Sequence, residues 1–485
     1  MDTYFSADRS TGIVKVSGET EVRLGTPDSF AHVEWKWDGT TLRCANDRYG
    51  IYPIYFCDQG HRFTLSPSID LLLRLTGEYE LDDDAVALAL RLGSNVANET
   101  LFPAIKAVPP NSTLTWTDGV LQIDSTPTVN NCILNISRDD AIDEYARLFS
   151  EAVGTSAPRS GKIAVPLSGG RDSRHILLEL VRRNFVPDRC LTVRRRPGLD
   201  DEDISVARLV CDRLELKHEI VEQTLGRFEA ECLKNVETGY AIQEHGWFVA
   251  LGTFTKNRWE NIYDGLAGDV LSAGLFLDQE ILDNYRNGKF DLLAEQVLGP
   301  EGYIPRLLSS SARKRFSRER AVERLKVELA KHADAPNPVG SFYFWNRTRR
   351  CVAQSPFRLL RSTPNIITPY LEPTLFDFLV SLPAEYFLDH TFHTETIRRA
   401  YPDYADIPYE SKKRQSRTDK ATEALLHRQL LELSMQPRRE EITNRAFFAS
   451  RQLAAFISPT ARESVASYLE IATGLLQLER LGVTS

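Results

Sequence analysis

The pattern of hydrophobic and polar positions changes along the chain, and it predicts a β-rich part followed by alternating strands and helices. Up to about residue 126, short alternating runs such as 41–45 and 51–56 are separated by Gly, Asp and Asn, which is typical of strands joined by turns. Residues 82–92 are expected to form a helix, because acidic residues at its start favour the helix dipole.

Farther on, a loop over 127–135 is followed by Ser137, which is expected to cap a helix with acidic residues in its first turn. From residue 161, four short apolar runs alternate with helical stretches, and this alternation predicts a parallel α/β sheet. The four predicted strands are 163–167, 189–193, 218–221 and 261–263.

After residue 275 the pattern is mostly helical, and the charged amphipathic stretch 311–332 is expected to be a solvated helix face. We therefore expect a β-rich domain over 1–126 and an α/β domain with a helical C-terminal part over 137–485. A chain of 485 residues is long enough for two or three hydrophobic cores.

Composition narrows the class of protein. Hydrophobic residues make up 42% and charged residues 26%, which argues against a disordered chain. A net charge of -8 gives no reason to expect nucleic acid binding, which needs a basic face. No membrane span and no secretory signal are found, so we expect a cytoplasmic protein with no membrane partner. The seven cysteines form no Cys-x-x-Cys pair; we expect reduced packing residues, with structural zinc as the alternative.

The segment 162–178 carries the clearest candidate chemistry. It predicts a buried strand, a Ser-Gly-Gly turn and the start of a helix. Two adjacent glycines let the backbone pass close to a ligand, and the helix start presents unpaired N–H groups. Such a turn suits phosphate or pyrophosphate, and Asp172 is placed where a carboxylate holds Mg²⁺ against phosphates. The alternative is a tight strand-to-helix turn capped by Ser or Asp.

The Walker spacing is absent. The hexapeptide 168–173 instead resembles the PP-motif of N-type ATP pyrophosphatases, which cleave ATP between the α and β phosphates and adenylate a substrate. Three further segments resemble the asparagine synthetase superfamily in the right order: 46–55 its glutaminase domain, 263–274 its second signature, and 369–383 its Pro-Phe-Leu-Asp segment. The resemblance runs from about Trp35 to about Arg414.

The resemblance implies ATP and Mg²⁺ as cofactors and assigns candidate site residues. Asp172 and Asp269 would bridge Mg²⁺ to the phosphates, and Lys412 or Lys413 would stabilise the acyl-transfer transition state. The alternative for the two lysines is a basic loop. The candidate nucleotide-binding residues are Leu167, Ser168, Gly169, Gly170, Asp172, Ser173, Val193 and Gly265.

Three departures from the family limit the chemistry. Position 2 is Asp2 and no cysteine precedes Cys44, so glutamine hydrolysis is not expected, because a carboxylate cannot replace the thiol. Val270 stands where the family has a glutamate, and Asn365 begins the segment that replaces its Glu-x-Arg.

Other charged side chains have two interpretations each. Arg171 and Arg174 bind phosphate or a substrate carboxylate, or form an exposed helix salt bridge. The arginines between 347 and 361 bind an anionic substrate, or line a helix face paired with acids. His175 and His218 are expected to be structural.

The sequence therefore favours an ATP-dependent ligase that adenylates a small-molecule or peptide carboxylate and forms an amide bond without glutamine. Within that class, a β-lactam synthetase-like or lasso peptide cyclase-like enzyme fits the missing cysteine. The alternative is a nucleotide-binding pseudoenzyme or regulatory partner subunit. The oligomeric state, including a homodimer, stays open.

Overall fold

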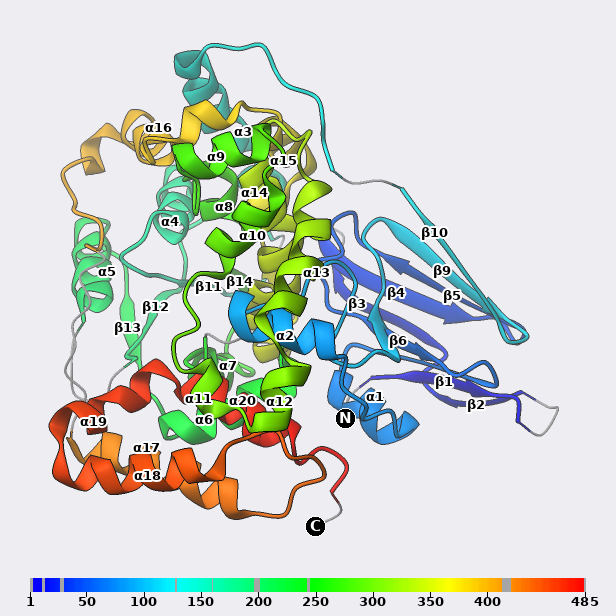
Figure 1. The fold of residues 1–485 in the computed structure, drawn as a ribbon. Coiled ribbons are helices and arrows are strands. Elements are labelled where there is room, and N and C mark those ends of the chain that lie inside the picture. Colours follow the sequence, from blue (N-terminus) through cyan, green and yellow to red (C-terminus); the bar gives the residue numbers. More distant parts are fainter. Residues whose placement is uncertain are drawn as a thin grey trace.

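A computed structural model describes residues 3–10, 14–26, 30–126, 129–158, 160–195, 201–241, 245–411 and 420–483. Two five-stranded antiparallel sheets are built from the first 125 residues (Figure 1). One has the strand order β2-β1-β7-β6-β8, with bounds β1 Phe5–Asp8, β2 Lys15–Gly18, β6 Tyr55–Asp58, β7 Arg62–Ser66 and β8 Ile105–Ala107. The other has the order β10-β9-β5-β4-β3, with bounds β3 Glu21–Thr26, β4 Ala31–Trp37, β5 Thr41–Asn46, β9 Ser112–Thr117 and β10 Val120–Ser125.

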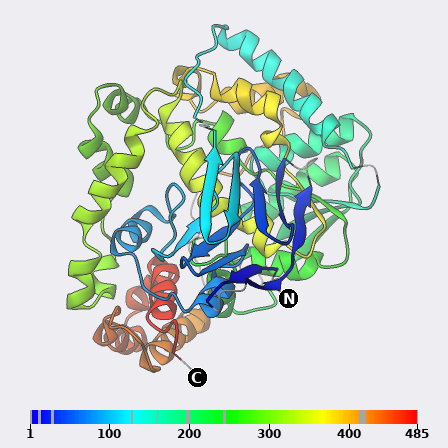
Figure 2. The same cartoon turned by 90° about the vertical axis from the view of Figure 1, so that its right-hand side faces the viewer.

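The two antiparallel sheets pack face to face around an aromatic core. Phe5 and Phe63 come from one sheet, and Trp35 and Trp116 from the other, and all four side chains are buried. Inward and outward residues alternate along β4, as a sheet with one buried face requires. The β-rich character predicted from the sequence is confirmed, and Figure 2 shows these strands in front of the rest of the molecule.

Two helices follow from local capping signals. Helix α2 (Asp83–Leu92) begins after Asp82, whose carboxylate accepts the backbone N–H groups of Asp84 and Ala85. Helix α3 (Arg138–Thr155) begins after Ser137, whose hydroxyl accepts the N–H of Asp140 at 3.1 Å. Both predicted helices are confirmed. A shorter helix, α1, spans Ile69–Thr76.

The parallel sheet has the strand order β13-β12-β11-β14-β15. Four strands match the predicted ones: β11 Ile163–Pro166, β12 Arg189–Val193, β13 His218–Val221 and β14 Asn261–Tyr263. The fifth, β15 (Asn365–Ile367), pairs in parallel with β14 but lies within the part predicted to be mostly helical. Three residues carry no periodicity, so this strand forms only because β14 offers an open edge.

The parallel sheet is flanked by helices of the intervening segments, as an α/β fold requires. These are α4 Asp172–Arg182, α5 Glu202–Arg213, α6 Arg227–Glu237, α7 Phe248–Thr255 and α8 Gly268–Ser272.

The segment after residue 275 is mainly helical, as predicted, and its last helices form the orange and red layer in Figure 1. The α-helices are α9 Gln279–Arg286, α10 Phe290–Leu298, α11 Ile304–Leu307, α12 Ser310–Arg315, α13 Arg318–Ala330, α14 Pro338–Tyr343, α15 Pro373–Val380, α16 Phe392–Ala400, α17 Lys420–Met435, α18 Arg445–Ile457, α19 Pro459–Glu463 and α20 Leu469–Leu478. Two π-helices, η2 Phe344–Val352 and η3 Ser355–Leu359, are also present. The short 3-10 helices are η4 Pro369–Leu371, η5 Ala384–Phe387, η6 Pro402–Tyr404 and η7 Ser464–Ser467.

Helix α13 is amphipathic, as predicted for the stretch 311–332, with one side buried and the charged side solvated. Ala321, Leu325 and Leu329 are buried in the main core, because this side of α13 packs on α2 and α10. Only the opposite, charged side faces solvent. None of the helices in the described ranges is long and apolar enough to cross a membrane.

Candidate functional site

The candidate site lies where the order of the parallel strands reverses. From β11 the chain continues to β12 on one side, whereas β14 lies on the other side of β11. The loops that leave β11 and β14 therefore flank a topological switch point, which is where open α/β sheets bind ligands.

The loop after β11 ends at an open helix start. Within the loop, Ser168 N–H donates to Ser173 Oγ at 3.2 Å, and Gly170 N–H donates to Ser168 Oγ at 3.2 Å. No side chain caps α4, which begins at Asp172. An uncapped helix start presents N–H groups and the positive end of the dipole, so this turn can receive an anion.

Asp172 is enclosed by the loop after β14. A Cβ at Gly268 would lie 2.7 Å from the Asp172 carboxyl carbon, so only glycine allows this approach. The backbone N–H of Asp269 donates to the Asp172 carboxylate. Burial raises the pKa of Asp172 well above its ordinary value, and the neighbouring Asp269 and Asp264 raise it further. The structure thus brings Asp172 and Asp269 together, as the sequence predicted.

Asp264 is a third carboxylate, which the sequence did not assign. Burial raises its pKa to about 6, although its oxygen accepts the N–H of Leu266 at 2.9 Å. Its position directly after a predicted strand is the signal that identifies it. The turn continues through Ala267, a non-glycine residue with φ of 76°, into α8. Three acidic side chains thus share one small region.

Gly169 was expected to contact phosphate, but its backbone N–H and carbonyl groups are both hydrogen-bonded within the protein. Gly169 N–H donates to Asp203 Oδ1 at 2.7 Å, and Glu410 N–H donates to the Gly169 carbonyl at 2.9 Å. Arg195 pairs with the other Asp203 oxygen at 2.8 Å. Burial and Asp203 together raise the pKa of Glu410 to about 7. The segment around Glu410 therefore packs directly on the loop that follows β11.

Arg174 fits neither of its two predicted roles. It is buried, and it donates to the carbonyls of Ile407 and Pro408 at 2.9 and 2.6 Å. Its guanidinium lies 4.0 Å from the centre of the Tyr409 ring, and that of Arg171 lies 4.9 Å from it. Arg174 is thus neither an exposed salt bridge nor a phosphate contact, and it fixes the segment 407–411 over the loop.

The other residues singled out in the sequence lie partly around the two loops and partly outside the described residues. Leu167 and Val193 are buried at the ends of β11 and β12, and Gly265 packs against the Cβ of Asp172. Val270 is buried, and Asn365 donates to the side chain of Asn261 at 3.0 Å across β14 and β15. Lys412 and Lys413 lie outside the described residues.

Three of the arginines between 347 and 361 are held by other parts of the protein. Arg349 and Arg350 are buried and donate to backbone carbonyls of Ala97 and Glu99. Arg361 pairs with Glu237. The predicted pairing with acids therefore holds for Arg361, whereas Arg349 and Arg350 are held by backbone carbonyls, which neither interpretation expected.

The two histidines expected to be structural make internal contacts. His218 lies 2.8 Å from Thr192 Oγ1, and His175 stacks on Phe149 with ring centres 3.6 Å apart.

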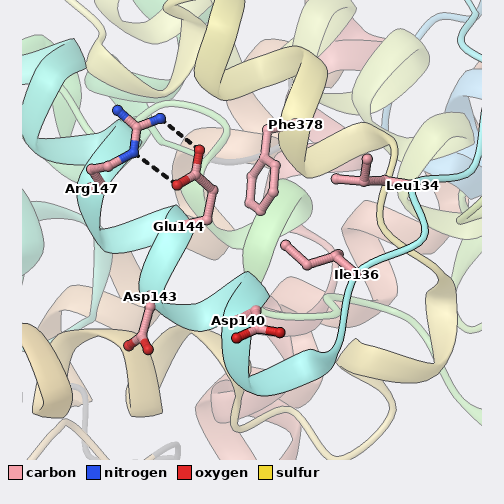
Figure 3. Close-up of a pocket in the computed structure, with 7 residues that line it drawn as sticks. All are labelled: Leu134, Ile136, Asp140, Asp143, Glu144, Arg147 and Phe378. Carbon is pink, nitrogen blue, oxygen red and sulfur yellow. Dashed lines mark hydrogen bonds and ion pairs between the residues drawn. The ribbon is translucent and has the colours of Figure 1, made fainter.

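A groove of about 430 Å³ lies between α3 and the segment that precedes it, which contains Leu134 and Ile136 (Figure 3). No residue of the loops after β11 and β14 lines this groove. Leu134, Ile136 and Phe378 form its apolar side, and Glu144 is paired with Arg147 on the other. Within the described ranges, no group of three or more His, Cys, Asp or Glu side chains is arranged to hold a metal ion by itself.

No protein-family model and no curated protein matches the sequence. Among solved structures, the chain is similar to the U34-tRNA thiolase NcsA from Methanococcus maripaludis with its 4Fe-4S cluster, at 13% identity, 72% coverage of this chain, 84% of that chain and a TM-score of 0.26. It is also similar to glutamine PRPP amidotransferase from B. subtilis complexed with ADP and GMP, at 10% identity and a TM-score of 0.14, covering 39% of this chain and 32% of that one. A third is the allosteric regulatory enzyme of purine biosynthesis, at 10% identity, 44% and 46% coverage, and a TM-score of 0.15. Likeness at this level assigns the chain to none of their families.

Proposed function

We propose that this protein is an ATP-dependent ligase that binds Mg·ATP at the ends of β11 and β14. It adenylates a small-molecule or peptide carboxylate, releases pyrophosphate and passes the acyl group to an amine. The observation that carries the proposal is the crowding of Asp172, Asp264 and Asp269 at the switch point, beside the uncapped start of α4.

The donor set suits Mg²⁺. Carboxylates that raise one another's pKa are costly without a cation, and a divalent ion next to them would remove that cost. Mg²⁺ usually takes one or two carboxylates and completes its shell with phosphate oxygens and water, so Asp172 and Asp269 suffice. When bound, the ion would neutralise charge on the phosphates. The residues of the chain would orient them.

The start of α4 would stabilise the leaving pyrophosphate. No side chain caps this helix start, and no Walker lysine is present to favour transfer of the γ-phosphate. Lys412 and Lys413 are proposed to supply positive charge during acyl transfer. They directly follow Ser411, whose hydroxyl donates to both Glu202 oxygens at 2.8 and 2.9 Å.

The nitrogen of the new amide bond would come from an amine on the substrate itself or from free ammonia. The part up to residue 126 is proposed to keep a glutaminase-like scaffold without its nucleophile. Its two cysteines are buried, and burial raises the pKa of Cys44 to about 12 and that of Cys57 to about 11. Neither thiol supplies a thiolate at neutral pH, so neither can attack an amide.

One observation favours a second candidate, a pseudoenzyme or regulatory partner subunit that does not turn over ATP. Asp203 already accepts the Gly169 N–H, and a carboxylate in that place disfavours a phosphate. Binding of a phosphate at the Gly169 N–H would then require Asp203 to move.

Product analysis with α-labelled ATP separates these functions. A panel of carboxylic acids and short peptides is incubated with the protein, ATP and Mg²⁺, with Asp172→Asn as the inactive control. AMP and pyrophosphate are expected with a suitable acid. ADP as the main product contradicts the proposal, and unchanged ATP across the panel, with Mg·ATP binding intact by calorimetry, supports the pseudoenzyme.

A further inference from the structure

Helix α18 presents an apolar face to solvent on the outside of the C-terminal helical layer. The exposed fraction is 67% for Leu453, 71% for Phe456 and 86% for Ile457, and these are the three most exposed large hydrophobic side chains of the described residues. Figure 1 shows α18 at the lower edge of the molecule. A cluster of exposed apolar side chains on a folded protein marks an interaction surface.

The apolar face extends along the helix. The exposed positions of α18 repeat at intervals of three and four residues, so they share about a third of the helix circumference. They are Ala446, Ala449, Ser450, Leu453, Phe456 and Ile457, which we call the α18 face. The Ser450 hydroxyl donates to the Phe447 carbonyl at 2.8 Å, within the helix, so its polar group is already satisfied.

Charged side chains are absent from the α18 face. The structure describes every residue of α18, and no Asp, Glu, Lys or Arg occupies an exposed position in it. Its two arginines are half-buried and donate to other groups of the protein at 2.9 Å, Arg445 to a backbone carbonyl and Arg451 to Ser464. Helix α17, which packs on α18, instead carries the exposed pair Arg428–Glu432. A helix face that contacts only water is expected to carry charges as α17 does.

Large and small side chains lie at opposite ends of the α18 face. The residues up to Ser450 are small, and those from Leu453 on are large. In an antiparallel pair centred between these two residues, the large half of each helix lies on the small half of the other. Ile457 then faces Ala446 of the second copy, and Leu453 faces Ser450 of the second copy. A two-fold axis joins identical surfaces in this way, and such a pair closes at two copies.

The lack of charge also favours a second copy over other occupants. Each chain carries a net charge of -8, so two copies repel each other wherever acidic surfaces meet, and the α18 face adds no charge to that repulsion. An anionic lipid surface is disfavoured, because it attracts an amphipathic helix through exposed Lys and Arg beside the apolar face.

The area of the face is sufficient for a weak dimer. The three large side chains of one copy present about 400 Å² to solvent, judged from the usual size of such side chains. With the rest of the face, two copies would bury about 1,000 Å², which is the lower end of the range for specific interfaces.

We propose that this protein forms a two-fold symmetric dimer through the α18 face, with the two α18 helices antiparallel. The inference does not depend on the proposed function, since α18 contains no residue of the loops after β11 and β14. An interface of this size should dissociate in the micromolar range, so the dimer depends on protein concentration.

Sedimentation velocity at concentrations from about 1 to 100 μM measures this equilibrium. Phe456→Glu places a charge in the face, and the chain should still fold because this side chain is largely exposed. Val327→Glu is the matched control, because Val327 is 58% exposed on α13 and lies outside the face. We expect the wild type and Val327→Glu to rise from the 54.9 kDa monomer toward twice that mass, and Phe456→Glu to need at least about tenfold more protein to do so.

Two results of this experiment would overturn the dimer. One is a wild type that stays monomeric at the highest concentration, and the other is equal dimerisation of the wild type and Phe456→Glu. A monomeric wild type that sediments with vesicles of anionic phospholipid, when Phe456→Glu does not, would assign the face to a lipid surface and also overturn the dimer.

Disulfide trapping tests the antiparallel arrangement. Ala446→Cys and Ile457→Cys are made separately in a Cys132→Ser background, because Cys132 is the exposed one of the seven cysteines. In the antiparallel pair the two positions 446 are about 16 Å apart, beyond disulfide reach, as are the two positions 457, whereas each faces the other type in the second copy. We expect a cross-linked dimer after mild oxidation only when the two variants are mixed. A variant that cross-links with itself, or a mixture that does not cross-link, contradicts the antiparallel pair.

Discussion

Replacing Asp264 by asparagine should stabilise the ligand-free protein at neutral pH. The Asp264 side chain is partly buried at the switch point, and desolvation there raises its pKa from 3.8 to about 6. Asparagine keeps the oxygen that accepts the Leu266 N–H and removes only the charge. The substitution therefore isolates the cost of holding an ionised carboxylate in this site.

The size of the effect follows from the pKa difference. The folded pKa lies about two pH units above the unfolded value, and each unit corresponds to about 1.4 kcal/mol, so ionisation costs the folded state about 3 kcal/mol at pH 7.5. Because the folded pKa is the higher one, the wild type has its full stability below about pH 3.8 and loses it as the pH rises through 6. The gain from Asp264→Asn should follow the same window: close to zero at pH 4 and about 3 kcal/mol at pH 7.5.

Urea unfolding of both proteins at several pH values between 4 and 8 measures this difference. Asp124→Asn is the control, because Asp124 is exposed on β10 and its replacement should change little at any pH. Mg²⁺ with ATP should narrow the gap, since a dication compensates the carboxylates. A gain that does not vary with pH, or a loss of stability at pH 7.5, would refute the electrostatic account of this site.

Three further predictions concern backbone strain, the close approach at Asp172 and the buried arginines. Ala267→Gly should raise the free energy of unfolding by about 1 kcal/mol, because Ala267 has φ of 76°, whereas Ala273→Gly, at φ of -105°, should lower it; urea unfolding compares them. Gly268→Ala should abolish Mg·ATP binding in calorimetry, because its Cβ would lie 2.7 Å from the Asp172 carboxyl carbon; Gly474→Ala, with 3.9 Å of clearance, should bind normally, and equal affinities would contradict the site. Arg349→Met should lower the unfolding free energy by about 2 kcal/mol, since it leaves the Ala97 carbonyl without its donor; the exposed-pair variant Arg428→Met should change it by well under 1 kcal/mol.

The parallel sheet could be predicted because its signals are local. A strand such as Arg189–Val193 is a short apolar run between polar loops, and the turn after β11 shows its glycines directly in the sequence. Asp172 and Asp269 could be predicted in the same way, because each follows a predicted strand within a few residues. The carboxyl ends of neighbouring parallel strands meet at one edge, and so the two loops come together.

The features that could not be predicted depend on distant partners. Arg174 is buried because Tyr409 and the carbonyls of Ile407 and Pro408 cover it, and no local pattern connects these segments. The hydrogen bond from the Gly169 N–H to Asp203 could not be predicted for the same reason, because Asp203 belongs to α5, far along the chain. Sequence patterns report which surface of an element is buried and not which residue covers it.

The same kind of distant contact joins the β-rich part to the helices of the rest of the chain. Its helix α2 meets α12 through the pair Asp83–Arg315 at 2.9 Å and α13 through the pair Asp84–Arg320 at 2.5 Å. These exposed pairs contribute little each. The buried contacts contribute more: Arg349 and Arg350 extend to the carbonyls of Ala97 and Glu99, and Gln354 donates to Tyr55 at 2.6 Å. If one of these acceptors were lost while its donor stayed buried, the unpaired donor would cost about 1–3 kcal/mol, so the β-rich part is an integral part of the fold.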